Sequence, residues 1–338
     1  MPELYVYPSF SGIDLGVLRL RGVGLGNLLF PWARCVVASH KRHLKMIAPT
    51  WPQICPGAFL RLERDKRSYH NAFLSPRDQV QGVRKLWLLA TLPRYFDESA
   101  SEASRGIICF RGTSGGFAPI LEDAELVRQQ LLTIVRRHHK DVCHVDFQHS
   151  ISIHVRRGDF RTPSGTNDIY GGCNGVRIPL SWYVDVISRL RDLVGREIPV
   201  FVFSDGTNEE LADLLAIPGV QRLGCGSAIA DLVALTRANV LIASGSSFSM
   251  WASYLGRMPV IWHKGQMLQR LYRANEAIEC EDASGQSLPT ELKNSFAPSP
   301  ARGKGIPAAG EESTGIGGTG AVGHETSSGL RARGSRMF

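Results

Sequence analysis

The sequence predicts an α/β protein that consists of two doubly wound domains and a disordered C-terminal tail. This prediction rests on the chain length, on an alternation of strand-like and helix-like segments, and on a change of composition near the C-terminus. With 338 residues, the chain exceeds the roughly 100 to 200 residues of one ordinary domain. Alternating strands and helices favour parallel sheets covered by helices on both faces, because parallel strands need crossover connections.

The alternation is most regular in the second half of the chain, where we expect a second domain at residues 148–296. Short apolar runs there have the length of buried strands, and the segments between them have the 3.6-residue period of helices. The expected strands are 150–155, 198–203, 220–223, 240–243 and 259–262, and the expected helices are 180–194, 208–215, 228–238 and 248–255.

The first half is less regular, and we assign it to a first domain at residues 1–147. Its segments again alternate between strand and helix character, which indicates a second parallel sheet. The expected strands are 17–21, 44–48 and 106–110, and the expected helices are 27–40 and 121–139.

The last 42 residues, 297–338, differ in composition from the rest of the chain. They contain ten Gly and one aromatic residue, and no apolar periodicity is sustained. Such a segment cannot bury enough apolar surface to offset the loss of chain entropy, so we expect a disordered tail.

Composition and charge exclude several classes of protein. With 43% hydrophobic and 21% charged residues, the chain is globular rather than collagen-like, coiled-coil or wholly disordered. The 39 Lys and Arg against 31 Asp and Glu give a formal charge of +8, which we interpret as a mild surplus spread along the chain. Such a surplus suits an anionic ligand without requiring nucleic acid, so we expect no nucleic-acid partner.

The sequence also bears on the compartment. No apolar run approaches the ~20 residues that cross a bilayer, and the first residues lack the pattern of a secretory signal. The seven cysteines are scattered without a C-x-x-C pair, so we interpret them as free thiols of a reducing compartment. We therefore expect a cytoplasmic protein without a transmembrane segment, and peripheral contact with the inner membrane face remains open.

Three loops that follow expected strands contain residues suited to an anionic ligand. Parallel sheets bind ligands beyond the carboxyl ends of their strands. In the first loop, Gly22-Val-Gly-Leu-Gly-Asn27, glycines such as Gly26 let a ligand approach the backbone, and the N-terminus of the next helix attracts anions. The G-x-G-x-G spacing matches neither the dinucleotide nor the Walker pattern, so an ordinary strand-to-helix turn is an equal alternative.

The second loop is His154-Val-Arg-Arg-Gly-Asp159. Because side chains alternate along a strand, His154 and Arg156 project from the same face, and Arg157 follows where the chain turns. Two guanidinium groups offer rigid forks of donors that suit a diphosphate. Asp159 could orient Arg156 or act as a base. A solvated, salt-bridged Arg pair is the competing interpretation.

The third loop, Ser244-Gly-Ser-Ser-Phe-Ser249, lies between a strand and a helix. Serine hydroxyls at a helix N-terminus cap the helix, and the same hydroxyls and amides can hold phosphate oxygens. Three such loops at equivalent positions of an α/β chain predict one phosphorylated ligand in a cleft.

Two acids follow the same pattern, and each also has an ordinary structural explanation. Asp205 follows an expected strand, where a carboxylate can meet a ribose or base or can cap the next helix. Asp231 lies in the first turn of an expected helix, where it could accept from the N–H groups of guanine or be solvated. We expect no metal site, because the His residues are scattered and no D-x-D occurs, and the G-x-S-x-G pattern of a serine nucleophile is also missing.

Taken together, these motifs resemble those of the α-1,2-fucosyltransferases, glycosyltransferase family 11, between about Arg21 and Trp262. Four motifs occur in the family's order, and the Arg motif is the most specific. They are Gly24-Leu-Gly-Asn27 with Phe30, His154-Val-Arg-Arg-Gly-Asp159 with Phe160, Phe203-Ser-Asp205, and ASGSSFSMWASYL at residues 243–255; the segment Ile178-Pro-Leu-Ser-Trp-Tyr183 also looks like the family's.

The resemblance implies a GT-B fold, with two facing Rossmann-like domains and GDP-fucose bound mainly by the second. It implies transfer of fucose to a hydroxyl of a glycan acceptor, α-1,2 to galactose, with inversion and without a metal or other cofactor. Fixed guanidinium and helix N-terminal donors can stabilise the leaving diphosphate in place of a metal. The resemblance also implies a role for each site residue. Arg156 holds the β-phosphate, with His154 and Arg157 beside it, and Asn27 approaches the phosphate from the first domain. Asp231 binds guanine, and the phosphates and nucleoside are bound by Ser246, Ser247 and Phe248.

The chain departs from the family pattern at three positions. Leu28 replaces a Gln, Gly206 replaces a second acid after Asp205, and Met250 replaces one of two tryptophans. These departures bear on the identity of the acceptor. For the general base, Asp159 is the first candidate and Asp168 the second. They also keep open a weak or inactive nucleotide- or glycan-binding module on the same fold. A dinucleotide-dependent oxidoreductase fits the glycine spacing poorly.

Overall fold

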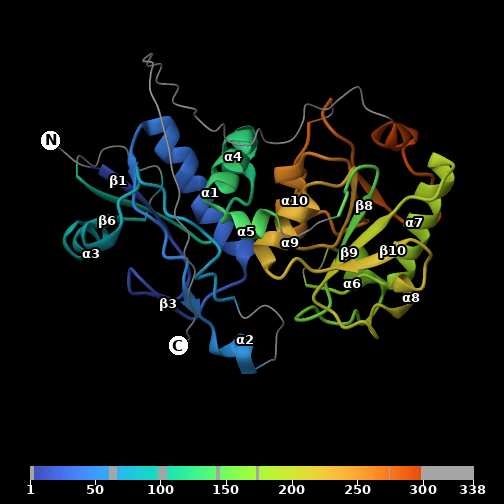
Figure 1. The fold of residues 1–338 in the computed structure, drawn as a ribbon, viewed down its shortest axis with the longest axis horizontal. Coiled ribbons are helices and arrows are strands. Elements are labelled where there is room, and N and C mark those ends of the chain that lie inside the picture. Colours follow the sequence, from blue (N-terminus) through green and yellow to red (C-terminus); the bar gives the residue numbers. More distant parts are fainter. Residues whose placement is uncertain are drawn as a thin grey trace, which may run out of the picture. The chain divides into compact units, whose positions relative to one another are not determined.

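The structure is a computed structural model that describes residues 4–60, 67–96, 98, 105–141, 145–172, 175–273 and 275–297. Residues 1–297 form one compact unit. Its α/β architecture with two all-parallel sheets confirms the predicted fold class at that level (Figure 1). The expected disordered tail lies, from residue 298 onward, outside the described residues.

The N-terminal half contains a four-stranded sheet of order β4-β1-β7-β6, in which the paired strands are parallel. A small second sheet, β2-β3-β5, lies beside it in the same half. The elements are β1 (Leu4–Ser9), β2 (Ile13–Asp14), β3 (Arg19–Leu20), α1 (Leu25–Arg42), β4 (Lys45–Met46), β5 (Gln53–Ile54), α2 (Pro56–Leu60), α3 (Gly82–Thr91), β6 (Arg94–Tyr95), β7 (Gly106–Arg111), the 3₁₀ helix η1 (Ala118–Asp123), α4 (Ala124–Ile134) and α5 (Arg137–Lys140).

The C-terminal half contains a six-stranded parallel sheet of order β10-β9-β8-β11-β12-β13. In chain order this is the doubly wound arrangement 3-2-1-4-5-6, whose direction of winding reverses between β8 and β11. The elements are β8 (Ile151–Val155), α6 (Thr166–Tyr170), α7 (Leu180–Val194), β9 (Val200–Ser204), α8 (Ala212–Leu215), β10 (Val220–Leu223), α9 (Ala228–Leu235), β11 (Val240–Ala243), α10 (Ser247–Gly256), β12 (Val260–His263), β13 (Glu279–Asp282) and the 3₁₀ helix η2 (Thr290–Phe296).

The two halves share one hydrophobic core. In Figure 1, α1, α4 and α5 face α9 and α10 near the middle of the view. An aromatic cluster of Phe30, Phe117, Trp251 and Tyr254 lies at this contact, with neighbouring ring centroids 4.8 to 5.4 Å apart. The hydroxyl of Tyr254 also donates to the carbonyl of Ile120 at 2.6 Å. Burial of these rings therefore holds the two halves together.

The expected elements of the C-terminal half lie close to the observed ones, whereas those of the N-terminal half do not. The expected strand at 17–21 is only the two-residue β3, and β1, one of the two inner strands of the four-stranded sheet, was not predicted. The long helix expected at 121–139 consists of the end of η1, then α4 and α5, and the extended backbone at Val135 separates α4 from α5. Strand β13, which adds a sixth strand beside β12, was not predicted.

The interpretation of all seven cysteines as free thiols is wrong. Cys225 is disulfide-bonded, whereas Cys35, Cys55, Cys109 and Cys280 are free. Burial raises the pKa of the Cys109 thiol to about 11, so this group is not a reactive thiolate at neutral pH. In the part of the chain that the structure describes, no helix is long and apolar enough to cross a membrane.

Candidate active site

A pocket of about 1110 Å³ lies between the two parallel sheets. One wall is formed at the C-terminal ends of β8, β9 and β11, where the winding of the second sheet reverses. Loops diverge at such a switch point and leave room for a ligand. All three loops chosen from the sequence line this pocket, and ten of the eleven expected site residues do so: Gly26, Asn27, His154, Arg156, Asp159, Asp205, Asp231, Ser246, Ser247 and Phe248.

His154, in β8, is buried against the serine loop. Its Nδ1 lies 2.7 Å from the hydroxyl of Ser249 and 3.2 Å from that of Ser244, and its ring packs 5.0 Å from Phe248. Burial, and secondarily the charge of Arg156, lower the pKa of His154 to about 3. The imidazole is therefore neutral at ordinary pH, so it orders the serine loop and adds no positive charge to the pocket.

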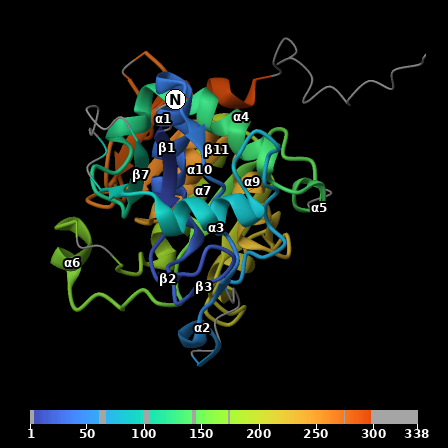
Figure 2. The same ribbon diagram turned by 90° about the vertical axis from the view of Figure 1, so that its left-hand side faces the viewer.

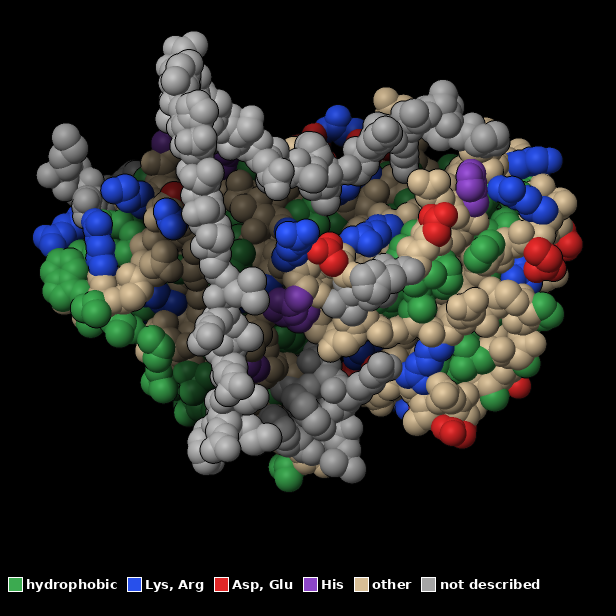
Figure 3. All heavy atoms as spheres, viewed as in Figure 1, with side chains coloured by type: hydrophobic (Ala, Val, Ile, Leu, Met, Phe, Trp, Pro, Cys, Tyr) green, Lys and Arg blue, Asp and Glu red, His purple; other side chains and the backbone are tan. Residues whose placement is uncertain are grey.

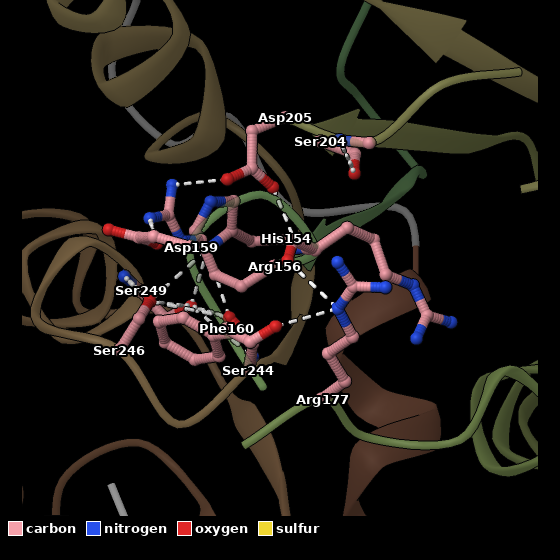
Figure 4. A network of polar contacts seen from close by, with 12 residues as sticks. His154, Arg156, Asp159, Phe160, Arg177, Ser204, Asp205, Ser244, Ser246 and Ser249 are labelled. Atoms are coloured by element: carbon pink, nitrogen blue, oxygen red, sulfur yellow. Dashed lines mark hydrogen bonds and ion pairs between the residues drawn. The ribbon is translucent and has the colours of Figure 1, made fainter. Parts of the chain in front are cut away.

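Arg156 lies between two carboxylates (Figure 4). Its Nη2 donates to Asp159 Oδ1 at 2.5 Å, and its Nη1 pairs with Asp205 Oδ2 at 2.8 Å. The guanidinium carbon also lies 5.1 Å from the ring centroid of Phe160. Three partners thus fix the direction of this fork of donors at the edge of the pocket.

Asp205 and Arg177 fix the shape of the loop that carries Arg156. Asp205 Oδ1 accepts the backbone N–H of Arg157 at 2.7 Å, and Arg177 donates from Nε to the carbonyls of Arg157 and Phe160 at 2.9 and 2.7 Å. A Cβ at Gly158 would lie 2.5 Å from Asp205 Oδ2, so a side chain does not fit there. Sequence reasoning missed Arg177, whose only signal was its place directly before the segment at 178–183.

Arg157 does not line the pocket, in contrast to the expectation that it lies beside the diphosphate. Its side chain packs against Gly206, where an added Cβ would lie 2.8 Å from Arg157 Cγ. This contact explains one departure from the family pattern: the side chain of Arg157 occupies the space that an acid at position 206 would need. Burial lowers the pKa of the Arg157 guanidinium, as expected for a packed rather than a solvated group.

The glycine loop and the serine loop meet at the bottom of the pocket. A Cβ at Gly26 would lie 2.8 Å from Ser247 Oγ, so the absence of a side chain lets α1 and α10 approach each other. Ser247 Oγ donates to Asn27 Oδ1 at 3.1 Å, and Trp251 Nε1 donates to the carbonyl of Gly26 at 2.7 Å. Ser246 caps α10 by accepting the N–H of Ser249. The N-terminus of α10 therefore points into the pocket.

The other two departures have different places in the fold. Leu28 is buried in the hydrophobic core that the two halves share and does not line the pocket, whereas Met250 does. Replacement of Gln by Leu28 therefore changes the core, and Met250 changes the pocket surface.

Asp231 lines the pocket together with residues that sequence reasoning missed. Its Oδ1 accepts the N–H of Cys225 at 2.6 Å. Nearby, His139 Nδ1 lies 2.9 Å from the hydroxyl of Ser227, the N-cap of α9, and its Nε2 lies 3.0 Å from the carbonyl of Asn71. Burial lowers the pKa of His139. This histidine thus connects the two halves beside Asp231.

Residues 67–72 of the N-terminal half form a further wall of the pocket. Arg67 Nη2 lies 3.8 Å from Asp159 Oδ2. Arg67 and Tyr69 have φ values of 56° and 49°, in the left-handed region that non-glycine residues seldom adopt.

The second base candidate is remote from this arrangement. Asp168 is not among the residues that line the pocket, and it accepts from Arg161 Nη1 at 2.7 Å and from the N–H of Ser164 at 2.8 Å. The bond to Arg161 is the main cause that lowers the pKa of Asp168. Within the described residues, no group of three or more His, Cys, Asp or Glu side chains is arranged to hold a metal ion.

Comparisons with known proteins agree with the sequence motifs. The model of "Glycosyl transferase family 11" matches residues 116–262. An alpha-1,2-colitosyltransferase of Escherichia coli is 25% identical over 270 residues, which cover 72% of this chain and 88% of that protein.

Solved structures give weaker similarities. A structure of NodZ alpha-1,6-fucosyltransferase soaked with GDP-fucose covers 77% of this chain and 95% of its own, at 16% identity and a TM-score of 0.47. POFUT1 in complex with GDP covers 77% of this chain and 98% of its own, at 11% identity and a TM-score of 0.42. At these values, neither similarity bears on the chemistry of this chain.

Proposed function

We propose that this chain, which resembles glycosyltransferase family 11 over residues 116–262 as its motifs predict, transfers fucose from GDP-fucose to a glycan hydroxyl. In this proposal the two sheets belong to the facing domains of a GT-B fold. The reaction inverts the fucosyl carbon, uses no metal and forms an α-1,2 linkage to galactose. The observation that carries the proposal is the convergence of Arg156, the capped N-terminus of α10 and the glycine loop on one pocket.

The diphosphate of the donor would lie between Arg156 and the start of α10. The first N–H groups of a helix have no carbonyl partner within it, and the helix dipole adds positive potential there. Cleavage of the bond between fucose and GDP increases the negative charge on the diphosphate. A guanidinium and helix N–H groups that are already in position stabilise that charge without reorganisation.

Asp159 would change partner when the diphosphate binds. In the structure, Arg156 is shared by Asp159 and Asp205, but the two carboxylates differ in how they are held. Asp205 is also fixed by the N–H of Arg157, whereas the side chain of Asp159 is 47% exposed. A diphosphate oxygen would therefore replace Asp159 on Arg156, and the released carboxylate could accept the proton of the acceptor hydroxyl.

Asp231 would bind and select the nucleobase. Its carboxylate is held by the N–H of Cys225, so its direction is set before a ligand binds. A carboxylate accepts from the N–H groups of guanine, which uracil and adenine do not present in the same pattern. The relative in Escherichia coli supports colitose as a second candidate for the transferred sugar, because it is described as an alpha-1,2-colitosyltransferase.

Calorimetric titration in EDTA with GDP, GDP-fucose, UDP, ADP and NAD tests the donor site. We expect binding of GDP and GDP-fucose alone, and selective binding of UDP or NAD would overturn the assignment. Hydrolysis and transfer assays with fucosyl and colitosyl donors then identify the sugar. Binding of GDP-fucose without transfer to any galactoside would instead favour a non-catalytic binding module.

A further inference from the structure

A cluster of apolar side chains lies exposed on the N-terminal half, away from the pocket. None of its members lines the pocket, and all belong to β2, β3, the turn between them, β5 or α3. Eight of the thirteen large hydrophobic side chains that are exposed among the described residues belong to this one cluster. We call it the apolar surface; it consists of Ile13, Leu15, Val17, Leu20, Ile54, Val83, Leu86 and Trp87.

Backbone pairing and packing make this surface continuous. Ile13 pairs with Leu20 across the β2–β3 hairpin, and Leu20 pairs with Ile54 in β5. The hairpin turn packs on α3, since a Cβ at Gly16 would lie 2.4 Å from Leu86 Cδ2. Figure 2 shows α3 on the face toward the viewer with β2 and β3 below it. Three segments that are distant in sequence thus present one apolar face.

Helix α3 is packed on its inner side, while side chains on its outer face are exposed. On the inner side, Leu88 is buried and Lys85 Nζ donates to Thr50 Oγ1 at 2.8 Å. On the outer side, Val83 is 82% exposed and Trp87, one turn later, is 56% exposed. The inner face of α3 thus already packs on the core. Val83 and Trp87 therefore form a second, exposed apolar face that the core does not need.

The charge of the chain is concentrated in the same half. Residues 1–96 contain 14 Lys and Arg and 5 Asp and Glu, whereas the whole chain contains 39 and 31. The surplus is therefore not spread along the chain, as the sequence analysis assumed, because the remaining residues are almost balanced. Arg21 and Arg84 are exposed at the edges of the apolar surface. At the left of Figure 3, hydrophobic side chains gather beside Lys and Arg.

We propose that the apolar surface binds an anionic lipid bilayer, with Val83, Trp87 and the β2–β3 turn inserted at the level of the headgroups. An aliphatic and aromatic face with a basic rim is the pattern of helices that lie in a membrane interface. Trp is favoured at that depth, and each basic residue near an anionic surface adds attraction. A second copy of the chain would meet the same positive charge on its partner, which disfavours a dimer through this surface.

Trp87 allows a direct test, because it is the exposed one of the six tryptophans. The other five, Trp32, Trp51, Trp182, Trp251 and Trp262, are at most 4% exposed. The full chain is mixed with vesicles of equal parts phosphatidylcholine and phosphatidylglycerol, and with vesicles of phosphatidylcholine alone. We expect cosedimentation with the anionic vesicles, loss of binding at high salt, and quenching of the fluorescence by brominated lipid.

Substitutions distinguish binding through the apolar surface from nonspecific adsorption to vesicles. The pair Val83→Ser and Trp87→Ser should lower partition into anionic vesicles on the order of tenfold or more, and Arg84→Glu should lower it severalfold. Leu74→Ser with Tyr170→Ser, two side chains 43% and 44% exposed outside the apolar surface, is the matched control and should leave partition unchanged. Equal melting temperatures verify that each variant is folded.

Three results would overturn the proposal. The wild-type chain could stay in the supernatant with anionic vesicles, or Val83→Ser with Trp87→Ser could bind as well as the wild type. Alternatively, sedimentation without lipid could show a dimer that the same pair of substitutions dissociates, which would assign the surface to a second copy of the chain.

Discussion

The two walls of the pocket are held in very different ways. On the wall of the second sheet, His154, Arg156 and Asp205 each have two or more polar contacts of 3.2 Å or less. On the wall of residues 67–72, Arg67 lies 3.8 Å from Asp159, two residues have left-handed backbone conformations, and the backbone carbonyls of Ser68, Asn71 and Ala72 accept hydrogen bonds of 2.9 to 3.2 Å. The side chains of the first wall are therefore held in place before a ligand arrives, whereas the second wall is held through its backbone.

This difference fits a division of labour between donor and acceptor. A diphosphate has a fixed geometry, so donors that are held in place lose little freedom when it binds. Acceptors vary, and loops that contact them tolerate sequence change without loss of the sheet beneath. Substitutions in the wall of the second sheet should therefore have larger effects than substitutions in the wall of residues 67–72.

The largest effect is expected for Arg156→Ala. If the guanidinium stabilises the leaving diphosphate, kcat should fall by a factor on the order of 10² to 10³, as for loss of one donor to a developing oxyanion. Arg137→Ala, at a side chain that is 93% exposed on α5, is the control for loss of an Arg and should retain full turnover. Near-normal turnover of Arg156→Ala would remove this residue from the mechanism.

Gly206→Asp would restore the acid typical of the family but should destabilise this chain. The new side chain would meet Arg157 Cγ and Cβ, so we expect a loss of about 1 to 3 kcal/mol in the free energy of unfolding, measured in urea. Combination with Arg157→Ala should recover part of this loss. Gly165→Asp is the matched control, because nothing lies within 4 Å of a Cβ there. Equal stability of the two Asp variants would contradict the packing argument.

His154 should make stability depend on pH below neutrality. Its folded pKa of about 3 is below the unfolded value of about 6.5, so from pH 6.5 downward the unfolded state takes up a proton that the folded state does not. Stability from this group is therefore complete above pH 6.5 and decreases by about 2 kcal/mol by pH 5. Urea unfolding of the wild type and of His154→Asn at pH 7 and pH 5 measures the difference. Identical pH dependence would show that His154 is not buried as a neutral group.

The smallest effect is expected for Arg67→Ala, which tests the contribution of the wall of residues 67–72. Because its contact with Asp159 is long and partly solvated, kcat should change by no more than about tenfold. The effect should appear mainly in KM for the acceptor, with the affinity for GDP retained. A decrease in kcat as large as that of Arg156→Ala would indicate that Arg67 binds the donor, and would contradict the proposed difference between the two walls.

How far the sequence predicts this molecule also differs between the two halves. In β9 and β11 continuous apolar runs, and in β8 an alternating one, end at small or charged residues, so both the strands and the site loops could be located by their pattern. The same reasoning placed a strand at residues 17–21, which the glycine loop follows directly, and missed β1, which a hairpin follows. Local pattern cannot distinguish a sheet's central strand from a short flanking one.

The contacts across the pocket could not be predicted for a related reason. Three of these contacts join residues that have no fixed spacing in sequence. They are the contacts of Arg67 with Asp159, of His139 with Ser227, and of Arg177 with the loop of Arg157. Arg157 was misplaced because alternation along a strand does not determine where a side chain points after the strand ends.

The aromatic cluster beneath the pocket limits how the protein could release the nucleotide that we propose it binds. Phe30, Phe117, Trp251 and Tyr254 are at most 5% exposed, and separation of the sheets would return all four rings to water. At about 1.5 to 3 kcal/mol per ring, such a separation is rarely populated. Small-angle X-ray scattering should accordingly give the same radius of gyration with and without GDP. The dwell time of the product then depends on side chains at the rim, so substitutions there can change the rate of product release while the bond-breaking step stays the same.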